Sequence, residues 1–185
     1  MKSQEDKFNL VLQSVARTGR QWDVSIPVAL LADDSFADLD VDSPLFSDMV
    51  WQGQLSAEAG SFMLKGTWQM NVPRQCGRCN VEFAQPMSGD VDVSYEIGSP
   101  ESQDMKAELE LTGDEPEVLE NGELNVLDVL REHFWLAWQP LVVCSEDCKG
   151  LCLQCGANKN QKRCDCSGEK KDNPFAALKN LKFDA

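Results

Sequence analysis

Eight cysteines arranged in close pairs constrain the fold of this chain of 185 residues more than any other feature. Three of the four pairs fall within residues 144–166, a stretch too rich in Gly, Lys, Asn and Asp to form a hydrophobic core. Zinc prefers four thiolates in a tetrahedron, and a C-x-x-C turn presents two sulfurs to one metal. The sequence therefore predicts one or two structural Zn²⁺ ions held by Cys76, Cys79, Cys144, Cys148, Cys152, Cys155, Cys164 and Cys166.

The sequence leaves open how the four pairs are shared between metals. One arrangement joins the pair 76/79 to 144/148 and the pair 152/155 to 164/166, but interleaved pairs satisfy the same stereochemistry. Cysteine ligation alone also permits an iron–sulfur cluster. Cys76 and Cys79, flanked by predicted strands, could instead be buried small hydrophobic residues.

The residues beside the cysteines add two expectations. Gly156 directly follows Cys155, where the tight turn of a zinc knuckle often needs a residue with positive φ. Positive charge close to a thiol lowers its pKa and favours metal binding. We expect this effect from Arg78, Lys159, Lys162 and Arg163.

The apolar segments indicate a cytoplasmic protein without a membrane span. Polar residues interrupt the apolar stretch 8–12 at once, so no signal-peptide core follows, and Gln139 and Pro140 break the stretch 134–143. Cytoplasmic thiols are kept reduced, which favours metal ligands over disulfides. Closed four-thiolate sites cannot activate water, and the single histidine, His133, has no accompanying nucleophile. We therefore expect neither an enzyme nor a small-molecule substrate.

Hydrophobic periodicity predicts an α+β fold. Alternating apolar residues indicate strands over 48–56 and 61–72, joined by a hairpin connection at 57–60. A second pair of strands is predicted over 81–83 and 90–97, with a turn at residues 85–89. An antiparallel sheet or a small barrel-like core with one buried face fits this pattern.

Helical spacing replaces the alternation over 124–138. Asn125 is expected to cap this helix and Pro140 to end it. Its aromatic face of Phe134, Trp135 and Trp138 is expected to pack on the sheet. We expect residues 1–143 to form the β-rich core and residues 144–185 the cysteine-rich zinc tail with a short terminal helix, both within one structural unit.

Charge divides the chain unevenly. Residues 1–148 carry 9 Lys+Arg against 27 Asp+Glu, whereas residues 149–185 carry 8 against 4. Within 101–128, ten acidic residues accompany a single Lys106. This run is either a solvated loop or a surface that meets a basic protein. The formal net charge of −14 argues against a protein that simply coats nucleic acid.

Several motifs together resemble the YceD family of bacterial and plastid proteins. They are Cys76-Gly-Arg-Cys79 with Phe83, the helix over 124–138, Lys149-Gly-Leu-Cys-Leu-Gln-Cys-Gly156, and Asn173-Pro-Phe-Ala-Ala-Leu178 in the closing segment. The resemblance implies a noncatalytic role in accumulation of the large-subunit (23S) ribosomal RNA and in ribosome assembly. The expected partners are ribosomal RNA or a pre-50S particle, a ribosomal protein, or both. If the acidic region takes part, it would meet a basic ribosomal protein.

Basic loops around zinc knuckles commonly contact phosphates or splayed bases. Candidate RNA- or partner-binding residues are therefore Lys149, Lys159, Lys162, Arg163, Lys170 and Lys171. A redox-switched zinc chaperone is the alternative function, because such proteins combine C-x-C with C-x-x-C around one zinc. Oxidation would then release the metal and expose apolar surface.

Overall fold

The computed structural model describes residues 6–15, 18–58, 60–98 and 116–166. Its main element is a five-stranded sheet in the order β2-β3-β4-β5-β6, formed by Arg20–Ile26, Met49–Glu58, Ser61–Gln75, Glu82–Ile97 and Glu117–Leu119. Neighbouring strands are antiparallel except β5 and β6, which are parallel. A separate two-stranded ribbon joins β1 (Asn9–Val11) to β7 (Glu123–Asn125). The predicted α+β class is thus confirmed.

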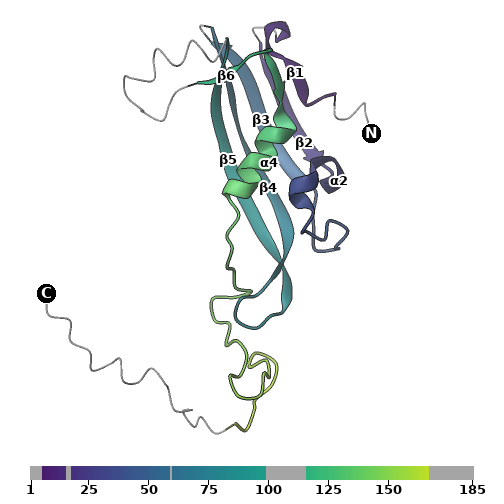
Figure 1. Cartoon of the computed structure of the whole chain (residues 1–185), viewed down its shortest axis with the longest axis vertical. Helices are drawn as coiled ribbons and strands as arrows, with labels where there is room; N and C mark the ends of the chain where they lie inside the picture. Colours follow the sequence, from purple (N-terminus) through teal and green to yellow (C-terminus); the bar gives the residue numbers. More distant parts are fainter. Residues whose placement is uncertain (1–5, 16–17, 59, 99–115, 167–185) are drawn as a thin grey trace, which may run out of the picture.

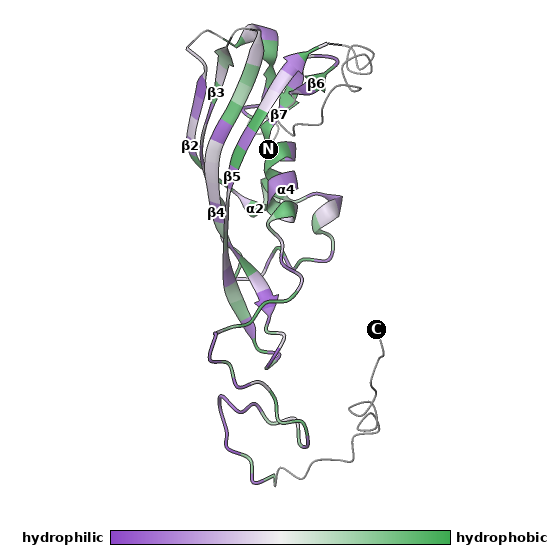
Figure 2. Ribbon diagram, turned by 90° about the vertical axis from the view of Figure 1, so that its left-hand side faces the viewer, coloured by the Kyte–Doolittle hydropathy of each residue, from purple (hydrophilic) through white to green (hydrophobic). Residues whose placement is uncertain are grey.

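Helix α4 (Val126–Leu136) covers one face of the sheet, with α2 (Val28–Leu31) on the same side (Figure 2). The short 3-10 helices η1 (Leu12–Ser14) and η2 (Asp34–Phe36) complete the described elements. Asn125 caps α4 as predicted, because its side chain accepts a hydrogen bond from the Leu127 amide. The helix ends at Leu136, four residues before Pro140.

Aromatic side chains close the core between α4 and the sheet, as the periodicity predicts. Phe134 is fully buried, stacks on Phe36 at 5.0 Å between ring centroids and lies 6.2 Å from Trp68. Trp135 and Trp138 are partly buried against the same cluster. No helix within the described ranges is long and apolar enough to cross a membrane.

The turn predicted at residues 85–89 is wrong. β5 runs unbroken from Glu82 to Ile97. It stays paired with β4 as far as the hairpin tip, where Gln75 lies opposite Glu82. Pro86 and Pro73 both lie where their strand has a single paired neighbour. Such an edge has N–H groups that no neighbour uses, so it accepts proline without losing a ladder hydrogen bond.

The long β4–β5 hairpin therefore projects beyond the helix-covered part of the sheet (Figure 1). The chain that leaves α4 runs along this projection towards the hairpin tip. Arg74 holds it there, since its guanidinium donates hydrogen bonds to the carbonyl oxygens of Gln139 (2.5 Å) and Pro140 (3.4 Å). The same group lies 3.8 Å from the Trp138 ring centroid. This arrangement brings the region after residue 140 to the tip.

Candidate metal centre

The eight cysteine sulfurs gather in two groups of four. The proximal tetrad consists of Cys76, Cys79, Cys144 and Cys148, and the distal tetrad of Cys152, Cys155, Cys164 and Cys166. Within each group all four sulfurs lie within 4.8 Å of one another. Of the arrangements that the sequence left open, this geometry matches the one without interleaving.

The tip of the β4–β5 hairpin supplies the first half of the proximal tetrad. The Cys76 amide donates to the Val81 carbonyl at 2.9 Å, and the Asn80 amide donates back to the Cys76 carbonyl at 2.9 Å. Asn80 has a φ of 56°, a left-handed conformation that Asn tolerates better than most residues. This turn places Cys76 and Cys79 on one side of the tip, where both are buried.

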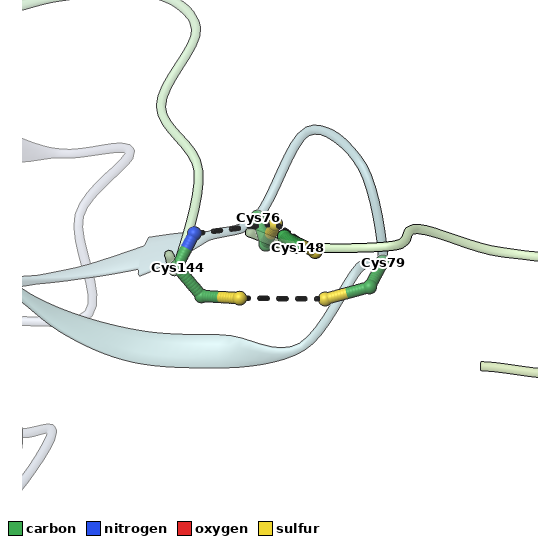
Figure 3. Close-up of side chains that lie close together, drawn as sticks. All are labelled: Cys76, Cys79, Cys144 and Cys148. Atoms are coloured by element: carbon green, nitrogen blue, oxygen red, sulfur yellow. Dashed lines mark hydrogen bonds between the residues drawn. The ribbon is translucent and has the colours of Figure 1, made fainter. Parts of the chain in front are cut away.

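The segment after α4 supplies the other half. The Gly77 amide donates to the Val142 carbonyl at 2.9 Å, and the Cys144 amide donates to the Cys76 sulfur at 3.3 Å. Figure 3 shows Cys144 facing Cys79 and Cys148 facing Cys76. Two chain segments more than 60 residues apart in sequence therefore complete one site.

The sulfur spacing suits a single tetrahedral metal. The Cys76 and Cys148 sulfurs are 3.8 Å apart, and those of Cys79 and Cys144 are 3.7 Å apart. Thiolates about 2.3 Å from a central Zn²⁺ would be separated by about 3.8 Å along a tetrahedron edge. A disulfide would require about 2.05 Å. The proximal tetrad thus has the donor set and the spacing of a four-thiolate zinc site.

Backbone amides lower the pKa of two thiols in the proximal tetrad, which favours binding of a cation. Burial opposes ionisation of Cys76, but amide hydrogen bonds from Cys144, Cys79 and Arg78 outweigh it and lower the Cys76 pKa to about 6. The Gly150 amide is the main cause that lowers the pKa of Cys148. Burial, followed by the neighbouring thiols, raises the pKa of Cys144 to about 12. Without a cation the tetrad therefore keeps some protons, because four adjacent thiolates would repel one another.

The distal tetrad repeats the same turn. The Gly156 amide donates to the Cys152 carbonyl at 2.9 Å, and the Cys152 amide donates to the Ala157 carbonyl at 2.8 Å. Gly156 has a φ of 72°, as the sequence predicts. Amides of Cys155 and Gln154 lower the Cys152 pKa to about 6. The Cys155 thiol, followed by burial, raises that of Cys166 to about 12. Cys155 and Cys166 are exposed, whereas Cys144 is the one exposed member of the proximal tetrad, so the distal tetrad is the more accessible of the two.

Hydrogen bonds join the two tetrads across the short link 149–151. The Leu151 amide donates to the Arg78 carbonyl at 3.0 Å. Asn160 accepts from the Lys149 amide at 2.8 Å and donates through its side-chain nitrogen to the Cys148 sulfur at 3.3 Å. Gly150, with a φ of 68°, lies so close to Arg78 that a Cβ atom would be 3.0 Å from its carbonyl oxygen. The link is therefore packed against the hairpin tip.

Backbone amides, rather than the basic side chains expected from the sequence, are the main causes of the lowered thiol pKa values. The Arg78 guanidinium donates to the carbonyl oxygens of Glu146 (3.0 Å) and Cys148 (3.2 Å), so it holds backbone in place. The amides named above are the largest causes that lower the thiol pKa values, and no basic side chain is among the main causes. A backbone N–H points at the sulfur from a fixed short distance, whereas an exposed cation is screened by water.

The predicted RNA-binding residues divide into two sets. Lys149, Lys159, Lys162 and Arg163 are exposed around the two tetrads. Lys170 and Lys171 lie outside the described residues, as does the predicted terminal helix within 172–182.

Sequence reasoning missed the contributions of Asn80, Gly150 and Asn160 to the site. The signals were an Asn directly after a C-x-x-C pair and a Gly within the short link between the tetrads.

Comparison with known proteins identifies the family to which this chain is similar. Residues 64–182 match the family described as large ribosomal RNA subunit accumulation protein YceD. A similar protein, the large ribosomal RNA subunit accumulation protein YCED homolog 1 (chloroplastic) of Arabidopsis thaliana, is 39% identical over 60 residues. That match covers 32% of this chain and 19% of the relative, so the chain spans about a fifth of that protein's length. No solved structure matches. The family match covers well over half of the chain, including the β4–β5 hairpin and both tetrads, and the chain therefore belongs to the YceD family.

Proposed function

We propose that this chain is a noncatalytic factor for 23S rRNA accumulation and large-subunit assembly, and that two structural Zn²⁺ ions hold its RNA-facing end. The observation that carries this proposal is the pair of four-sulfur groups within the region that matches the family. The family's name, which refers to large ribosomal RNA accumulation, supplies the biological process. The cytoplasm, where thiols stay reduced, is the compartment that suits these ligands.

Zinc suits the proximal tetrad better than an iron–sulfur cluster does. In a four-iron cluster each cysteine binds a different iron, so the sulfurs lie farther apart than the ligands of a single metal. The edges of 3.7 and 3.8 Å correspond to one central ion. Four thiolates also fill a tetrahedral shell and leave no position for water, which supports a structural ion and a noncatalytic protein.

The basic end of the molecule supports contact with RNA. Residues 149–166 contain Lys149, Lys159, Lys162 and Arg163 against a single acidic residue, Asp165. All four basic side chains are exposed on loops whose backbone the cysteine turns hold in place. Lysine and arginine neutralise phosphates and release counterions, which supplies most of the affinity of such contacts. The acidic remainder of the chain would keep other faces away from RNA.

A matched pair of variants tests this proposal. Tagged chain is separated with ribosomal particles on sucrose gradients, with nuclease treatment and salt titration as controls. Lys159→Gln with Lys162→Gln is expected to weaken association and to reduce the salt slope by about 2, one for each lost phosphate contact. The control, Lys7→Gln with Lys65→Gln, removes the same charge elsewhere and should change neither quantity. No association of the unmodified chain with large-subunit particles or rRNA would show that the proposal is wrong.

The distal tetrad favours a second candidate, a redox-switched chaperone. Cys155 and Cys166 are exposed, and the geometry combines the C-x-C pair 164/166 with the C-x-x-C pair 152/155. Oxidation of exposed thiols would remove zinc ligands as disulfides form. A holdase assay with and without peroxide tests this candidate, and equal activity in both conditions would eliminate it.

A further inference from the structure

A cavity of about 600 Å³ lies between the β1–β7 ribbon, the first half of α4 and the β5–β6 end of the sheet. Figure 1 places these elements at the opposite end of the molecule from the cysteine loops. Its rim carries four carboxylates, and no basic residue in the described part of the chain lines it. We call it the acidic groove, and its acidic members are Glu117, Glu123, Asp128 and Glu132.

Most of this negative charge has no ion-pair partner among the residues that the structure describes. Asp128 pairs with Arg131, but Glu117, Glu123 and Glu132 form no salt bridge with any residue that the structure describes. All four carboxylate side chains are exposed. Four carboxylates around one cavity make the groove electronegative, which favours a cationic ligand there.

Tyr95 gives the groove a feature that a solvated acidic face lacks. Its side chain lines the cavity and is only 1% exposed. Its hydroxyl has no hydrogen-bond partner among the described residues and is not one of their fully buried unpaired atoms, so the oxygen is accessible to a ligand. Burial, followed by Glu117 and Glu132, raises the pKa of Tyr95, so the phenol stays neutral and its oxygen can accept a hydrogen bond. Glu117 lies directly beside it in the β5–β6 register.

The floor of the groove is apolar. Leu10, Leu124 and Val129 line the cavity and are buried to at least nine-tenths. A hydrated divalent cation prefers a shell composed of oxygen ligands and gains nothing from such a floor. An arginine or lysine side chain combines an aliphatic stem, which packs on apolar surface, with a charged head that reaches carboxylates. Arginine fits best, because its planar guanidinium donates several hydrogen bonds at once and can pair with more than one carboxylate.

We infer that the acidic groove is a docking site for an arginine side chain on a basic peptide segment of a partner protein. The stem would lie on the leucine and valine floor, and the guanidinium would pair with Glu117 and Glu132 and donate to the Tyr95 hydroxyl. This inference extends the proposed function, and rests on it only for the identity of the partner as a ribosomal protein. The acidic groove and the basic cysteine loops would then engage different components of one particle from opposite ends of the molecule.

The test uses the purified full chain without ribosomes. The probe is a blocked Gly-Arg-Gly-Arg-Gly peptide, and its matched control carries the neutral isostere citrulline in place of arginine. Peptide is titrated while backbone amide resonances are followed by NMR. The arginine peptide is expected to shift amides of β6, β7 and the first turn of α4, and the citrulline peptide is expected to leave them unchanged.

Variants distinguish specific binding in the groove from nonspecific electrostatic attraction to an acidic protein. Glu117→Gln with Glu132→Gln should weaken peptide binding on the order of tenfold, and Tyr95→Phe, which removes one hydroxyl, on the order of threefold to tenfold. Glu82→Gln with Glu146→Gln removes two carboxylates outside the groove and should change binding less than about twofold, because distant exposed charges are screened.

Two outcomes would overturn the inference. Equal weakening by both double variants would mean that the peptide responds to net charge alone. Shifts of the same amides by Mg²⁺, with no effect of Tyr95→Phe on peptide binding, would indicate a divalent cation site instead. Neither outcome bears on the gradient experiment, so failure of this docking site is distinguishable from failure of the ribosomal assignment.

Discussion

The two cysteine tetrads use the same ligands and the same C-x-x-C turn, but they differ in what surrounds them. In the proximal tetrad, Cys76, Cys79 and Cys148 are buried, and the four ligands come from the hairpin tip and from the segment after α4. In the distal tetrad all four ligands come from residues 152–166, and two of them are exposed. The same set of four cysteines can therefore serve different structural purposes in one chain. A proximal zinc would fasten the tail to the sheet, whereas a distal zinc would order only its own loop.

The two tetrads are expected to differ most in what happens when one pair of their cysteines is removed. Cys76→Ser with Cys79→Ser should release the segment 140–150 from the hairpin tip, because zinc binding and local folding are coupled. Amide hydrogen exchange at Gly77 and Cys144, whose amides donate between the two segments, should accelerate on the order of a hundredfold or more. Cys152→Ser with Cys155→Ser is the matched control and should leave those amides protected. Equal acceleration in both variants would abolish the distinction between the tetrads.

Metal removal should follow the exposure of the ligands. A chelator reaches Cys155 and Cys166 directly, whereas three of the four proximal ligands, all except the exposed Cys144, are buried and must first be uncovered. Distal zinc is therefore expected to leave on the order of tenfold faster, as measured by stopped-flow transfer to a coloured chelator. Two phases should become a single slow phase in the Cys152→Ser/Cys155→Ser variant. A single fast phase in that variant would contradict the assignment.

The pKa values predict how many protons zinc displaces from the proximal tetrad. The Cys76 pKa of about 6 lies below the ordinary thiol value, so this group is already ionised at pH 7.5. Zinc binding should then release fewer than four protons at pH 7.5 and about one more at pH 5.5, where Cys76 is protonated. Calorimetry of the Cys152→Ser/Cys155→Ser chain in buffers of different ionisation enthalpy measures this number. Release of four protons at both pH values would show that the amides do not ionise Cys76.

Folding of the metal-free chain should depend on pH in the same sense. The stabilisation from a lowered thiol pKa is fully present above the unfolded value of about 8.5 and is lost as pH falls through about 6. The raised pKa of Cys144 has the opposite effect on stability. The folded chain keeps this proton at a pH where the unfolded chain loses it, so this group favours unfolding as pH rises. Stability of the metal-free hairpin tip should therefore increase between pH 6 and pH 8.5. The free energy of local opening, obtained from amide hydrogen exchange, measures this change. A decrease over this range would contradict the assigned cause.

The smallest expected difference concerns two glycines with similar backbone conformations. Gly156 has a φ of 72° with no atom near the position of a Cβ, so Gly156→Ala should cost about 1 kcal/mol of backbone strain. Gly150 has a φ of 68° and also lies against the Arg78 carbonyl, so Gly150→Ala should cost about 2–3 kcal/mol. The free energy of local opening at Leu151, from hydrogen exchange, measures the difference. Equal costs would mean that the link between the tetrads is not packed on the hairpin.

Local signals made much of this architecture predictable. The spacing of apolar residues and the Asn125 cap identify α4, because a helix is determined by neighbours a few residues apart. The Cys152–Gly156 turn was predictable for the same reason. The continuity of β5 through Pro86 was not, because whether a strand accepts proline depends on which of its edges is paired.

The composition of the tetrads depended on long-range structure. Cys144 meets Cys79 only because the chain after α4 follows the projecting hairpin, held by Arg74 and by the bond from Gly77 to Val142. Nothing in the spacing of the cysteine pairs encodes that path. The acidic groove likewise combines residues of β1, β5, β6, β7 and α4, and the sequence alone showed only that the surrounding region is acidic.

Native mass spectrometry of the purified chain tests the central claim most directly. The unmodified chain should bind two zinc ions. Cys76→Ser with Cys79→Ser, Cys144→Ser with Cys148→Ser, Cys152→Ser with Cys155→Ser, and Cys164→Ser with Cys166→Ser should each retain one. Combining the first two pairs should still leave one ion, whereas combining the first and third should leave none. Absence of zinc from the unmodified chain, or loss of both ions on removal of the first two pairs, would contradict the account.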